Sequence, residues 1–348
     1  MKLIMKEYKS KNILVTGGAS FIGSHLVDKL VASGSIVSVV DDLSSGIMGN
    51  LEKSMSSIKF IEADLRDTST NKYFKDQDYV FHLANIHGGR GFIETHPGEI
   101  CQNFLIDGNV FRSCHEHGVK KVVYTSSACA YPTNLQSSNL EEQERYLSEE
   151  MANPFKKGAA LADGEYGWAK FMGEMALKAY NKQYGMKGVS CRLFTVYGPR
   201  ENESHAVIAL IAKALVRQDP YEIWGTGQQD RNFTYVSDIV DGIMLSGLKI
   251  DDCRSINIGT SEITKIVDAA KIIMEILQFS PNKINFDTSK PEGVHARAAS
   301  IEMQKEWLNW EPVISFDEGI KSTIEWYAQY CDVEELKKTL QKKLFERK

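Results

Sequence analysis

Three side chains in this sequence belong to the types that move protons in enzymes: Cys129, Tyr166 and Lys170. Tyr166 and Lys170 are four residues apart, so on a helix the phenol and the ammonium share one face. A free tyrosine, with a pKa of about 10, is a poor base at neutral pH, and a neighbouring positive charge favours its phenolate. Ser127 can complete the hydrogen bonds around a substrate hydroxyl. A thiol beside such a set indicates proton exchange at carbon in addition to hydride transfer, although a lone cysteine is more often a small buried apolar residue.

The elements that must position these residues alternate along the chain. Short runs rich in β-branched and aromatic residues predict strands at 12–16, 36–40, 58–61, 79–82, 119–125, 189–193 and 256–258. Helical spacing predicts helices between them, the longer ones at 103–117 and 166–184. Strands separated by helices indicate an α/β fold with a doubly wound parallel sheet. Cys129 then follows one strand, and Tyr166 begins one of the long helices.

The alternating pattern breaks after Tyr197-Gly198-Pro199, where the loops lengthen. The sequence therefore predicts two lobes. The first spans 1–196, and 235–259 is expected to return to it. The second is a smaller mixed α/β lobe made of 197–234 and 260–348.

A glycine-rich turn, Thr16-Gly17-Gly18-Ala19-Ser20-Phe21-Ile22-Gly23, joins the first strand to the first helix. Glycines in such a turn let the backbone approach a pyrophosphate, which the helix N-terminus attracts. Asp41 ends the second strand, where a carboxylate accepts the ribose hydroxyls of NAD and repels the 2′-phosphate of NADP. Asp64-Leu65, after the third strand, is expected at the adenine end, with a simple turn aspartate as the alternative. The motif predicts a Rossmann-type NAD site.

The length, composition and charge of the chain exclude several classes of protein. The chain has 348 residues, 43% of them hydrophobic, and a net charge of −5 without a dense lysine block, so we expect no nucleic-acid partner. No apolar run approaches the roughly 18 residues of a membrane span, and residues 1–11 lack the features of a secretory signal. Six scattered cysteines indicate reduced thiols and a cytoplasmic location. The segment Cys114-His115-Glu116-His117 has metal-binding residue types, but its i, i+2 spacing on a helix points the side chains apart, so we predict no metal site.

Taken together, these motifs resemble the extended short-chain dehydrogenase/reductase family, and within it the nucleotide-sugar branch. The resemblance covers about residues 11–312. It also rests on Phe81-His82-Leu83-Ala84, Ser126-Ser127-Ala128, Tyr197-Gly198-Pro199, Arg231-Asn232-Phe233, Tyr235-Val236-Ser237-Asp238 and Pro291-Glu292-Gly293. One departure is Ser20, which stands where the family usually has the middle glycine of the turn. The resemblance implies that NAD contacts Gly17, Ser20, Phe21, Ile22, Gly23, Asp41, Asp64, Leu65, Leu83, Ala84, Tyr166 and Lys170.

Shorter segments of the sequence indicate which enzymes of the nucleotide-sugar branch the chain resembles most. Residues 86–92 and the segment around Cys129 are similar to the substrate loop and the catalytic-cysteine segment of the GDP-mannose 3,5-epimerases. The segment around His205 is similar to the one that carries the catalytic histidine of the GDP-fucose synthases. The resemblance implies that Tyr166 takes the C4 hydroxyl proton of a nucleotide sugar and that the resulting ketone acidifies C3 and C5. Cys129 and His205 would then invert a centre from opposite faces, and the hydride would return to C4. The alternative for His205 is a surface histidine.

The resemblance also implies a set of substrate-binding residues. Arg231 and Arg297 are expected at the diphosphate, because a planar guanidinium suits bidentate phosphate contact. The remaining candidates are Gly88, Gly89, Arg90 and, more weakly, Asn103 and Arg192. A GDP-mannose-type substrate is favoured, with UDP, dTDP and CDP sugars open. A homodimer through the helices at 103–117 and 166–184 is expected from the family.

Several other functions compete with this interpretation. A 4-epimerase of the family usually has a hydroxyl residue in place of Cys129, and a 4,6-dehydratase usually has an Asp-Glu pair at 128–129. A 4-dehydrogenase that releases a keto sugar stays open. A catalytically silent dinucleotide-binding sensor is a different class, and the presence of both Tyr166 and Lys170 counts against it.

Overall fold

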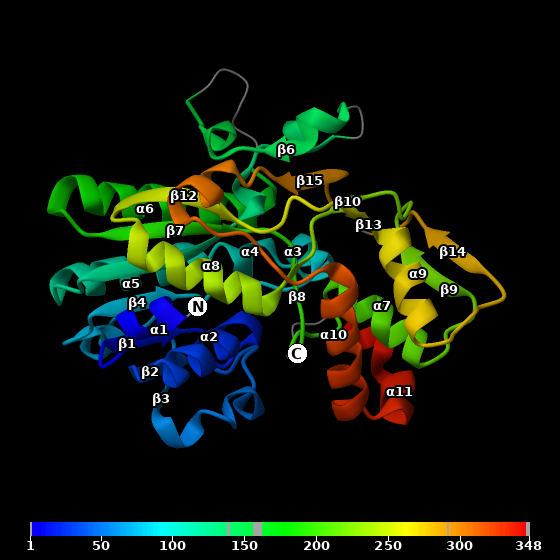
Figure 1. Cartoon of the computed structure of the whole chain (residues 1–348), viewed down its shortest axis with the longest axis horizontal. Coiled ribbons are helices and arrows are strands. Elements are labelled where there is room, and N and C mark those ends of the chain that lie inside the picture. Colours follow the sequence, from blue (N-terminus) through cyan, green and yellow to red (C-terminus); the bar gives the residue numbers. More distant parts are fainter. Residues whose placement is uncertain (1, 138–139, 156–161, 291, 346–348) are drawn as a thin grey trace.

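The structure is a computed structural model that describes residues 2–137, 140–155, 162–290 and 292–345. Figure 1 shows two unequal lobes, with the large sheet and its helices on one side and a smaller group of elements on the other. Pro291, part of one motif named above, lies outside the described residues.

A seven-stranded sheet forms the larger lobe, in the order β12-β7-β5-β4-β1-β2-β3. All of its strand pairs are parallel. The strands are β1 (Asn12–Thr16), β2 (Ile36–Asp41), β3 (Ile58–Glu62), β4 (Tyr79–His82), β5 (Lys121–Ser127), β7 (Gly188–Leu193) and β12 (Asp252–Ile258). The strand order reverses direction between β1 and β4, which is the point where doubly wound sheets bind ligands. The predicted α/β fold with a Rossmann-type sheet is therefore confirmed.

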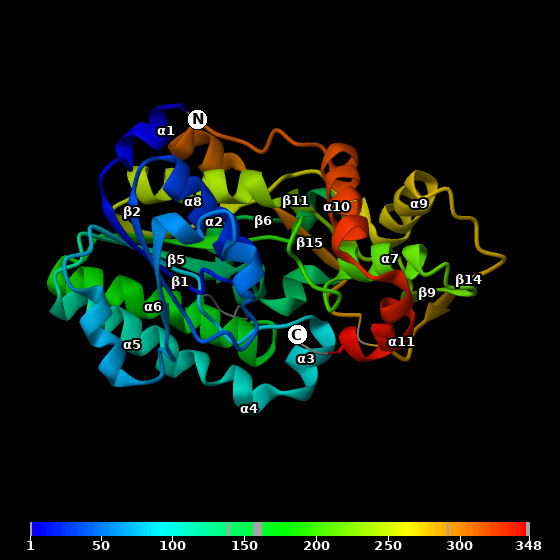
Figure 2. The same ribbon diagram turned by 90° about the horizontal axis from the view of Figure 1, so that it is seen from below.

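Helices cover both faces of this sheet (Figure 2). One face carries α1 (Lys2–Glu7), α2 (Phe21–Ala32) and α8 (Val236–Lys249). The other carries α5 (Asn103–Glu116) and α6 (Gly164–Tyr184), with the short α3 (Arg90–Thr95) and α4 (Pro97–Ile100) beyond them. Side chains alternate across the sheet, so Ile13 and Val15 of β1 pack under the first group and Leu14 under the second. Burial on both faces explains why the strands are continuous apolar runs.

The strand before the cysteine starts and ends two residues later than its sequence pattern predicts. Val119 does not begin β5, because its N–H closes the end of α5 by bonding to the Cys114 carbonyl, after Gly118 at φ +64°. β5 instead runs to Ser127. This shift makes Ser127 the last residue of the strand and brings it to the sheet edge.

The smaller lobe combines short sheets with four helices among the described residues. A four-stranded mixed sheet has the order β13-β10-β15-β6, and two parallel pairs, β11-β8 and β14-β9, accompany it. Its strands are β6 (Tyr146–Leu147), β8 (Val196–Tyr197), β9 (Tyr221–Trp224), β10 (Asp230–Arg231), β11 (Thr234–Tyr235), β13 (Thr264–Lys265), β14 (Ile284–Asp287) and β15 (Ala296–Ala299). Its helices are α7 (Ala206–Leu215), α9 (Ile266–Ile276), α10 (Phe316–Tyr330) and α11 (Val333–Lys343), which share a second apolar core.

One connection between the lobes is not apparent from the sequence pattern. The chain between β5 and α6 leaves the large sheet, and its strand β6 pairs with β15 (Figure 1). Residues from this excursion and from β15 consequently lie near each other. No described helix has both the length and the apolar character needed to cross a bilayer.

Candidate active site

A cavity of about 580 Å³ lies between the lobes, at the carboxyl ends of the large sheet's strands. The turn after β1, the loop after β4, the end of β5 and the start of α6 line it from one side, and residues of the smaller lobe line it from the other. Parallel strands bring their carboxyl ends to a common edge, so residues distant in sequence meet there.

The glycine turn has a geometry that only glycine allows at two positions. Gly17 has φ +70°, and a Cβ there would lie 2.7 Å from the Ala84 nitrogen. A Cβ on Gly23 would collide with the carbonyl oxygen of Gly17. Ser20, the departure from the family pattern, has φ −82°, an ordinary conformation for any residue, so the substitution introduces no backbone strain. Gly17, Gly23 and Ser20 all line the cavity, with the N-terminus of α2 behind them.

Asp41 stabilises the glycine turn through two hydrogen bonds to backbone N–H groups. Its carboxylate accepts the N–H groups of Ala19 and Leu43, each at 2.9 Å, and it is buried. Asp41 is not among the residues that line the cavity, whereas Ser45 and Asn50 from the following segment are. The structure therefore shows Asp41 shaping the cofactor turn.

Tyr166 and Lys170 lie on α6 as their spacing predicts, and both line the cavity. The Lys170 ammonium donates to the Thr125 carbonyl at 2.9 Å and lies 6.0 Å from the centre of the Tyr166 ring. Burial lowers the pKa of Lys170 and raises the pKa of Tyr166 above 10, although a hydrogen bond with Ser127 acts against the second shift. The sequence argument considered neighbouring positive charges alone, and burial is the larger effect here. When bound, NAD supplies the hydride acceptor and a positive nicotinamide ring, which favours the phenolate.

Cys129 is held directly beside Tyr166 by the backbone. The Ser127 hydroxyl accepts the Cys129 N–H at 3.1 Å as the short helix η4 (Ala128–Ala130) begins. The Cys129 carbonyl accepts the N–H of Asp163 at 2.9 Å. A Cβ on Gly167 would collide with that same carbonyl, so α6 approaches this closely because residue 167 is glycine. This arrangement places thiol, phenol and hydroxyl in one wall of the cavity.

His205 enters from the smaller lobe as the residue that precedes α7. Its ring centre is 5.3 Å from that of His87, which in turn is 4.7 Å from the ring of Tyr166. The His205 Nδ1 lies 3.6 Å from a carboxylate oxygen of Glu201. Burial raises the pKa of Glu201 and lowers that of His205 to about 4. The loop after β4 is tied to this segment, since the Gly89 N–H bonds to the Ser204 hydroxyl at 3.2 Å.

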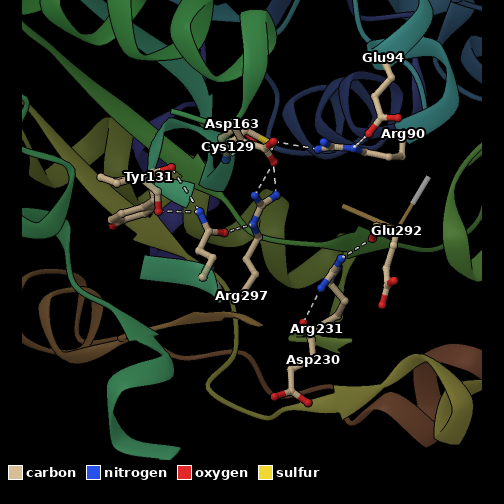
Figure 3. Close-up of polar contacts among 12 residues, drawn as sticks. Arg90, Glu94, Cys129, Tyr131, Asp163, Asp230, Arg231, Glu292 and Arg297 are labelled. Atoms are coloured by element: carbon tan, nitrogen blue, oxygen red, sulfur yellow. Dashed lines mark hydrogen bonds and ion pairs between the residues drawn. The ribbon is translucent and has the colours of Figure 1, made fainter. Parts of the chain in front are cut away.

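Four arginines line the cavity, and Figure 3 shows three of them, Arg90, Arg231 and Arg297. Arg90 and Arg297 both contact Asp163, at 2.8 Å and 2.7 Å. Arg231 donates to the carbonyls of Asp230 and Glu292 and makes no ion pair among the described residues. Burial and the nearby charge of Arg297 lower the pKa of Arg231 to about 10. The cavity thus carries excess positive charge, which suits a diphosphate.

Most of the sequence-predicted site residues reach this cavity, and some do not. Those that line it are Gly17, Ser20, Phe21, Ile22, Gly23, Leu83, Gly88, Gly89, Arg90, Ser127, Cys129, Tyr166, Lys170, His205, Arg231 and Arg297. Those that do not are Asp41, Asp64, Leu65, Ala84, Asn103 and Arg192. Arg192 instead forms a buried ion pair with Glu174 at 2.7 Å.

The residues outside the cavity lining have structural contacts instead. The Asp64 carboxylate pairs with Arg66 at 2.6 Å, and Leu65 is buried in the core. The Ala84 N–H bonds to the Thr16 hydroxyl at 3.3 Å. The Asn103 side chain accepts the Ile86 N–H at 2.7 Å and donates to the Ile86 carbonyl at 2.9 Å, so it braces the loop after β4.

Sequence reasoning missed several cavity residues. Asp163 was not considered, although an acidic residue directly before the helix of Tyr166 is a visible signal. His87 was noted only as part of a loop, and Glu201 was not noted despite its i, i+4 spacing from His205. Lys343, from the end of α11, also lines the cavity, and no spacing in the sequence connects it with the site.

Comparisons with known proteins agree with this site. Residues 13–259 match the model of the NAD dependent epimerase/dehydratase family. The chain is 31% identical to GDP-mannose 3,5-epimerase of Arabidopsis thaliana, over 93% of this chain and 84% of that protein. It is also 31% identical to a putative UDP-glucose 4-epimerase of Methanocaldococcus jannaschii, over 90% and 97% of the two chains.

A solved structure shows the same fold. UDP-glucose 4-epimerase from Thermotoga maritima, crystallised with UDP-glucose, superposes with a TM-score of 0.81 at 30% identity, covering 91% of this chain and 99% of that one. These likenesses confirm the resemblance seen in the sequence. The chain belongs to the NAD-dependent epimerase/dehydratase family, a branch of the extended short-chain dehydrogenases/reductases with NAD as cofactor.

Proposed function

We propose that the chain is an NAD-retaining nucleotide-sugar epimerase that inverts C3, C5 or both after transient oxidation at C4, with a GDP-mannose-type substrate favoured. The observation that carries this proposal is that Cys129, His205 and Tyr166 line one cavity from different elements. Tyr166 stands on α6, Cys129 on the segment after β5, and His205 at the start of α7. An inversion at carbon needs a base and an acid on opposite faces, and these elements offer a thiol and an imidazole from two lobes.

In this mechanism Tyr166 removes the C4 hydroxyl proton, with Ser127 as its hydrogen-bonding partner. The lysine ammonium, buried and fixed on the Thr125 carbonyl, offers a positive charge near the phenol. A ketone at C4 acidifies the neighbouring C–H bonds. Cys129 and His205 then remove and return a proton on opposite sides, and reduction at C4 restores the alcohol. Arg231 binds the diphosphate, since its guanidinium is half-buried and has no carboxylate partner among the described residues.

The proposed function can be tested by measuring the incorporation of solvent deuterium into the sugar. The purified holoenzyme is incubated in deuterated water with GDP-mannose and, in parallel, with UDP-glucose and dTDP-glucose, and deuterium is located in the recovered sugars by NMR. We expect deuterium at C3 or C5 of the GDP sugar. Cys129→Ser is expected to suppress this exchange while hydride transfer at C4 continues, and Cys101→Ser, an exposed cysteine outside the cavity, serves as the control.

Other outcomes would select another activity. Conversion of UDP-glucose without deuterium at carbon indicates a 4-epimerase, as the likeness to the Thermotoga protein would favour. Deuterium at C5 together with loss of water from C6 indicates a 4,6-dehydratase. Exchange at the wild-type rate in Cys129→Ser would remove the cysteine from the mechanism.

We also propose a homodimer through α5 and α6 in a cytoplasmic setting. Large apolar side chains are exposed on these two helices: Phe104, Leu105, Trp168, Met172 and Tyr184. An exposed apolar patch of this kind marks an interaction surface. All six cysteines are free thiols, which fits a reducing compartment.

A further inference from the structure

Glu201 is a buried carboxyl that lies behind the imidazole of His205. Both residues line the cavity, but the side chain of Glu201 is 4% exposed and that of His205 is 29% exposed. One carboxyl oxygen, Oε1, lies 3.6 Å from Nδ1 of the imidazole. The other, Oε2, is buried without a hydrogen-bond partner among the described residues. The imidazole is therefore the member of this pair that reaches the open cavity, with the carboxyl at its back.

Backbone contacts from both lobes hold this pair in place. The Glu201 N–H bonds to the Gly198 carbonyl at 3.4 Å, and the His205 carbonyl accepts the first full-turn hydrogen bond of α7 at 2.9 Å. A Cβ on Gly89 would collide with the carbonyl oxygen of Ser204, so the loop after β4 packs tightly against the segment that joins the two side chains. The relative position of carboxyl and imidazole is thus a property of the closed cavity.

The surroundings of Glu201 offer no cation that would stabilise its charged form. Among the described residues it has no lysine or arginine partner, and the guanidinium of the adjacent Arg200 pairs with Asp28 at 2.8 Å. The ring packed against His205 from the larger lobe is that of His87, 5.3 Å away between ring centres. A buried carboxyl in such surroundings keeps its proton, since burial disfavours the charged form and raises the pKa of Glu201. Burial also keeps His205 neutral, with a pKa lowered to about 4.

We propose that Glu201 is a positioning residue that holds a proton for His205 and passes it through the imidazole to the sugar carbon. A carboxylic acid that donates to Nδ1 leaves the imidazole proton on Nε2, on the far side of the ring. A movement of roughly half an ångström brings the two groups within hydrogen-bond range. The inference rests on the proposed function and goes beyond it by naming the source of the proton that His205 delivers.

The carboxyl is needed because a neutral imidazole alone is a very weak acid. If His205 released its Nε2 proton without help, it would be left as an anion in a buried site. When Nδ1 takes the proton of Glu201 in the same step, the imidazole stays neutral throughout. The negative charge then appears on the carboxylate, which is the better acid of the two.

The base of the reaction stands on the larger lobe. The Cys129 sulfur follows β5 and contacts Nη1 of Arg297 at 3.2 Å, with Asp163 beside them (Figure 3). As a thiolate, Cys129 takes the proton of the C–H bond next to the C4 ketone, S–H forms, and the electron pair moves to the carbonyl oxygen as an enolate. The enolate carbon then takes the Nε2 proton of His205 from the other face, Nδ1 takes the proton of Glu201, and the ketone is restored.

Infrared difference spectroscopy of the NAD-loaded protein at neutral pH tests the proton on Glu201 without a substrate. In the spectrum of the wild type minus Glu201→Gln, we expect the C=O band of a protonated carboxyl, which shifts in deuterated water. In His205→Phe, measured against the double variant, this band should move to higher wavenumber because the carboxyl O–H loses its acceptor. His205→Ala replaces His205→Phe should the larger ring not fit.

Glu203→Gln is the matched control. Glu203 is a carboxyl of the same loop and lines the same cavity, but it accepts the Tyr327 hydroxyl at 2.6 Å and pairs with Lys343 at 2.8 Å. Its removal should leave the band of the protonated carboxyl unchanged. A wild-type spectrum without that band would overturn the proposal, and so would a band that does not respond to the loss of His205. Retained NAD and an unchanged melting temperature identify the variants that are folded.

The configuration of the sugar gives a second measurement. With the nucleotide sugar that takes up solvent deuterium, the ratio of inverted to retained product at the deuterated carbon is determined by NMR. Glu201→Gln should lower this ratio at least about tenfold, because the amide can donate a hydrogen bond to Nδ1 but cannot release a proton, while Cys129 still exchanges on its own face. An unchanged ratio contradicts the relay. Absence of exchange with every nucleotide sugar in the wild type would instead reject the proposed function, and the infrared bands would still decide whether Glu201 holds a proton against His205.

Discussion

The buried ion pair between Glu174 and Arg192 offers a sharp test of how the sheet edge beneath the active site is built. Glu174 is fully buried and Arg192 is 2% exposed. Arg192 donates to the carboxylate at 2.7 and 2.8 Å, while the hydroxyls of Ser126 and Ser255 donate to it at 2.5 and 2.6 Å. Removing the arginine leaves a buried carboxylate with hydroxyl donors alone. We expect Arg192→Met to lower the free energy of unfolding by about 3–5 kcal/mol at pH 8.

This loss in the free energy of unfolding should depend on pH, and its direction follows from the pKa of Glu174. In the wild type, burial acts to raise the pKa of Glu174, but Arg192 and the hydroxyls hold it below its ordinary value. The pair therefore stabilises above the unfolded-state pKa of about 4.3 and is lost as pH falls through the lower folded value. In Arg192→Met burial dominates, so the folded pKa of Glu174 rises above the unfolded one. The deficit should then grow by roughly 1.4 kcal/mol per pH unit above pH 4.3, until the raised pKa is reached.

Urea unfolding at pH 5 and pH 8, with NAD at one saturating concentration, measures this difference. The control is Arg192→Met combined with Glu174→Leu, which removes both charges and should recover most of the stability. An equal deficit at both pH values would refute the electrostatic reasoning. It would mean that the packing of the arginine stem, not the stranded carboxylate, accounts for the loss.

Three further predictions concern the cavity and the assembly. Glu201→Gln should leave the pKa of His205 near its lowered value of about 4, because burial raises the pKa of Glu201 and keeps that carboxyl uncharged where His205 titrates; a carbon-13 NMR titration of the histidine checks this, and a clear further drop would show that Glu201 is ionised. Gly23→Ala should abolish NAD retention, read from the absorbance of the purified protein, whereas Gly98→Ala, where a Cβ would meet open space, should retain it. Phe104→Asp, at a side chain 44% exposed on α5, should produce monomers in sedimentation velocity, and a persistent dimer would place the interface elsewhere.

The fold could be predicted from the sequence because the residue patterns that indicate it are local. The strands are unbroken apolar runs, and the turn of Gly17 and Gly23 carries its own conformational requirement. The start of β5 was misplaced because Gly118 and Val119 terminate α5 through a hydrogen bond that composition does not reveal. Boundaries of this kind depend on backbone geometry, which residue preferences describe poorly.

The site could be predicted only in part, because the orientation of its side chains depends on contacts with residues far away in the sequence. Tyr166 and Lys170 were found from their spacing, but the effect of burial on the phenol was not, since burial is a property of the folded chain. Arg297 was recognised as a site residue, but its orientation depends on Asp163 and Gln136, which no sequence motif connects with it.

The contact between Arg297 and the Cys129 sulfur closes a loop of 168 sequence positions. Contacts of such separation form late, because the entropy of closing a long loop must be overcome before they contribute. The contact between Arg297 and Cys129 is thus expected to form only when the smaller lobe has docked on the larger one. In refolding experiments the alkylation rate of Cys129 at neutral pH would serve as an internal probe of lobe assembly, separate from probes that follow the formation of the sheet.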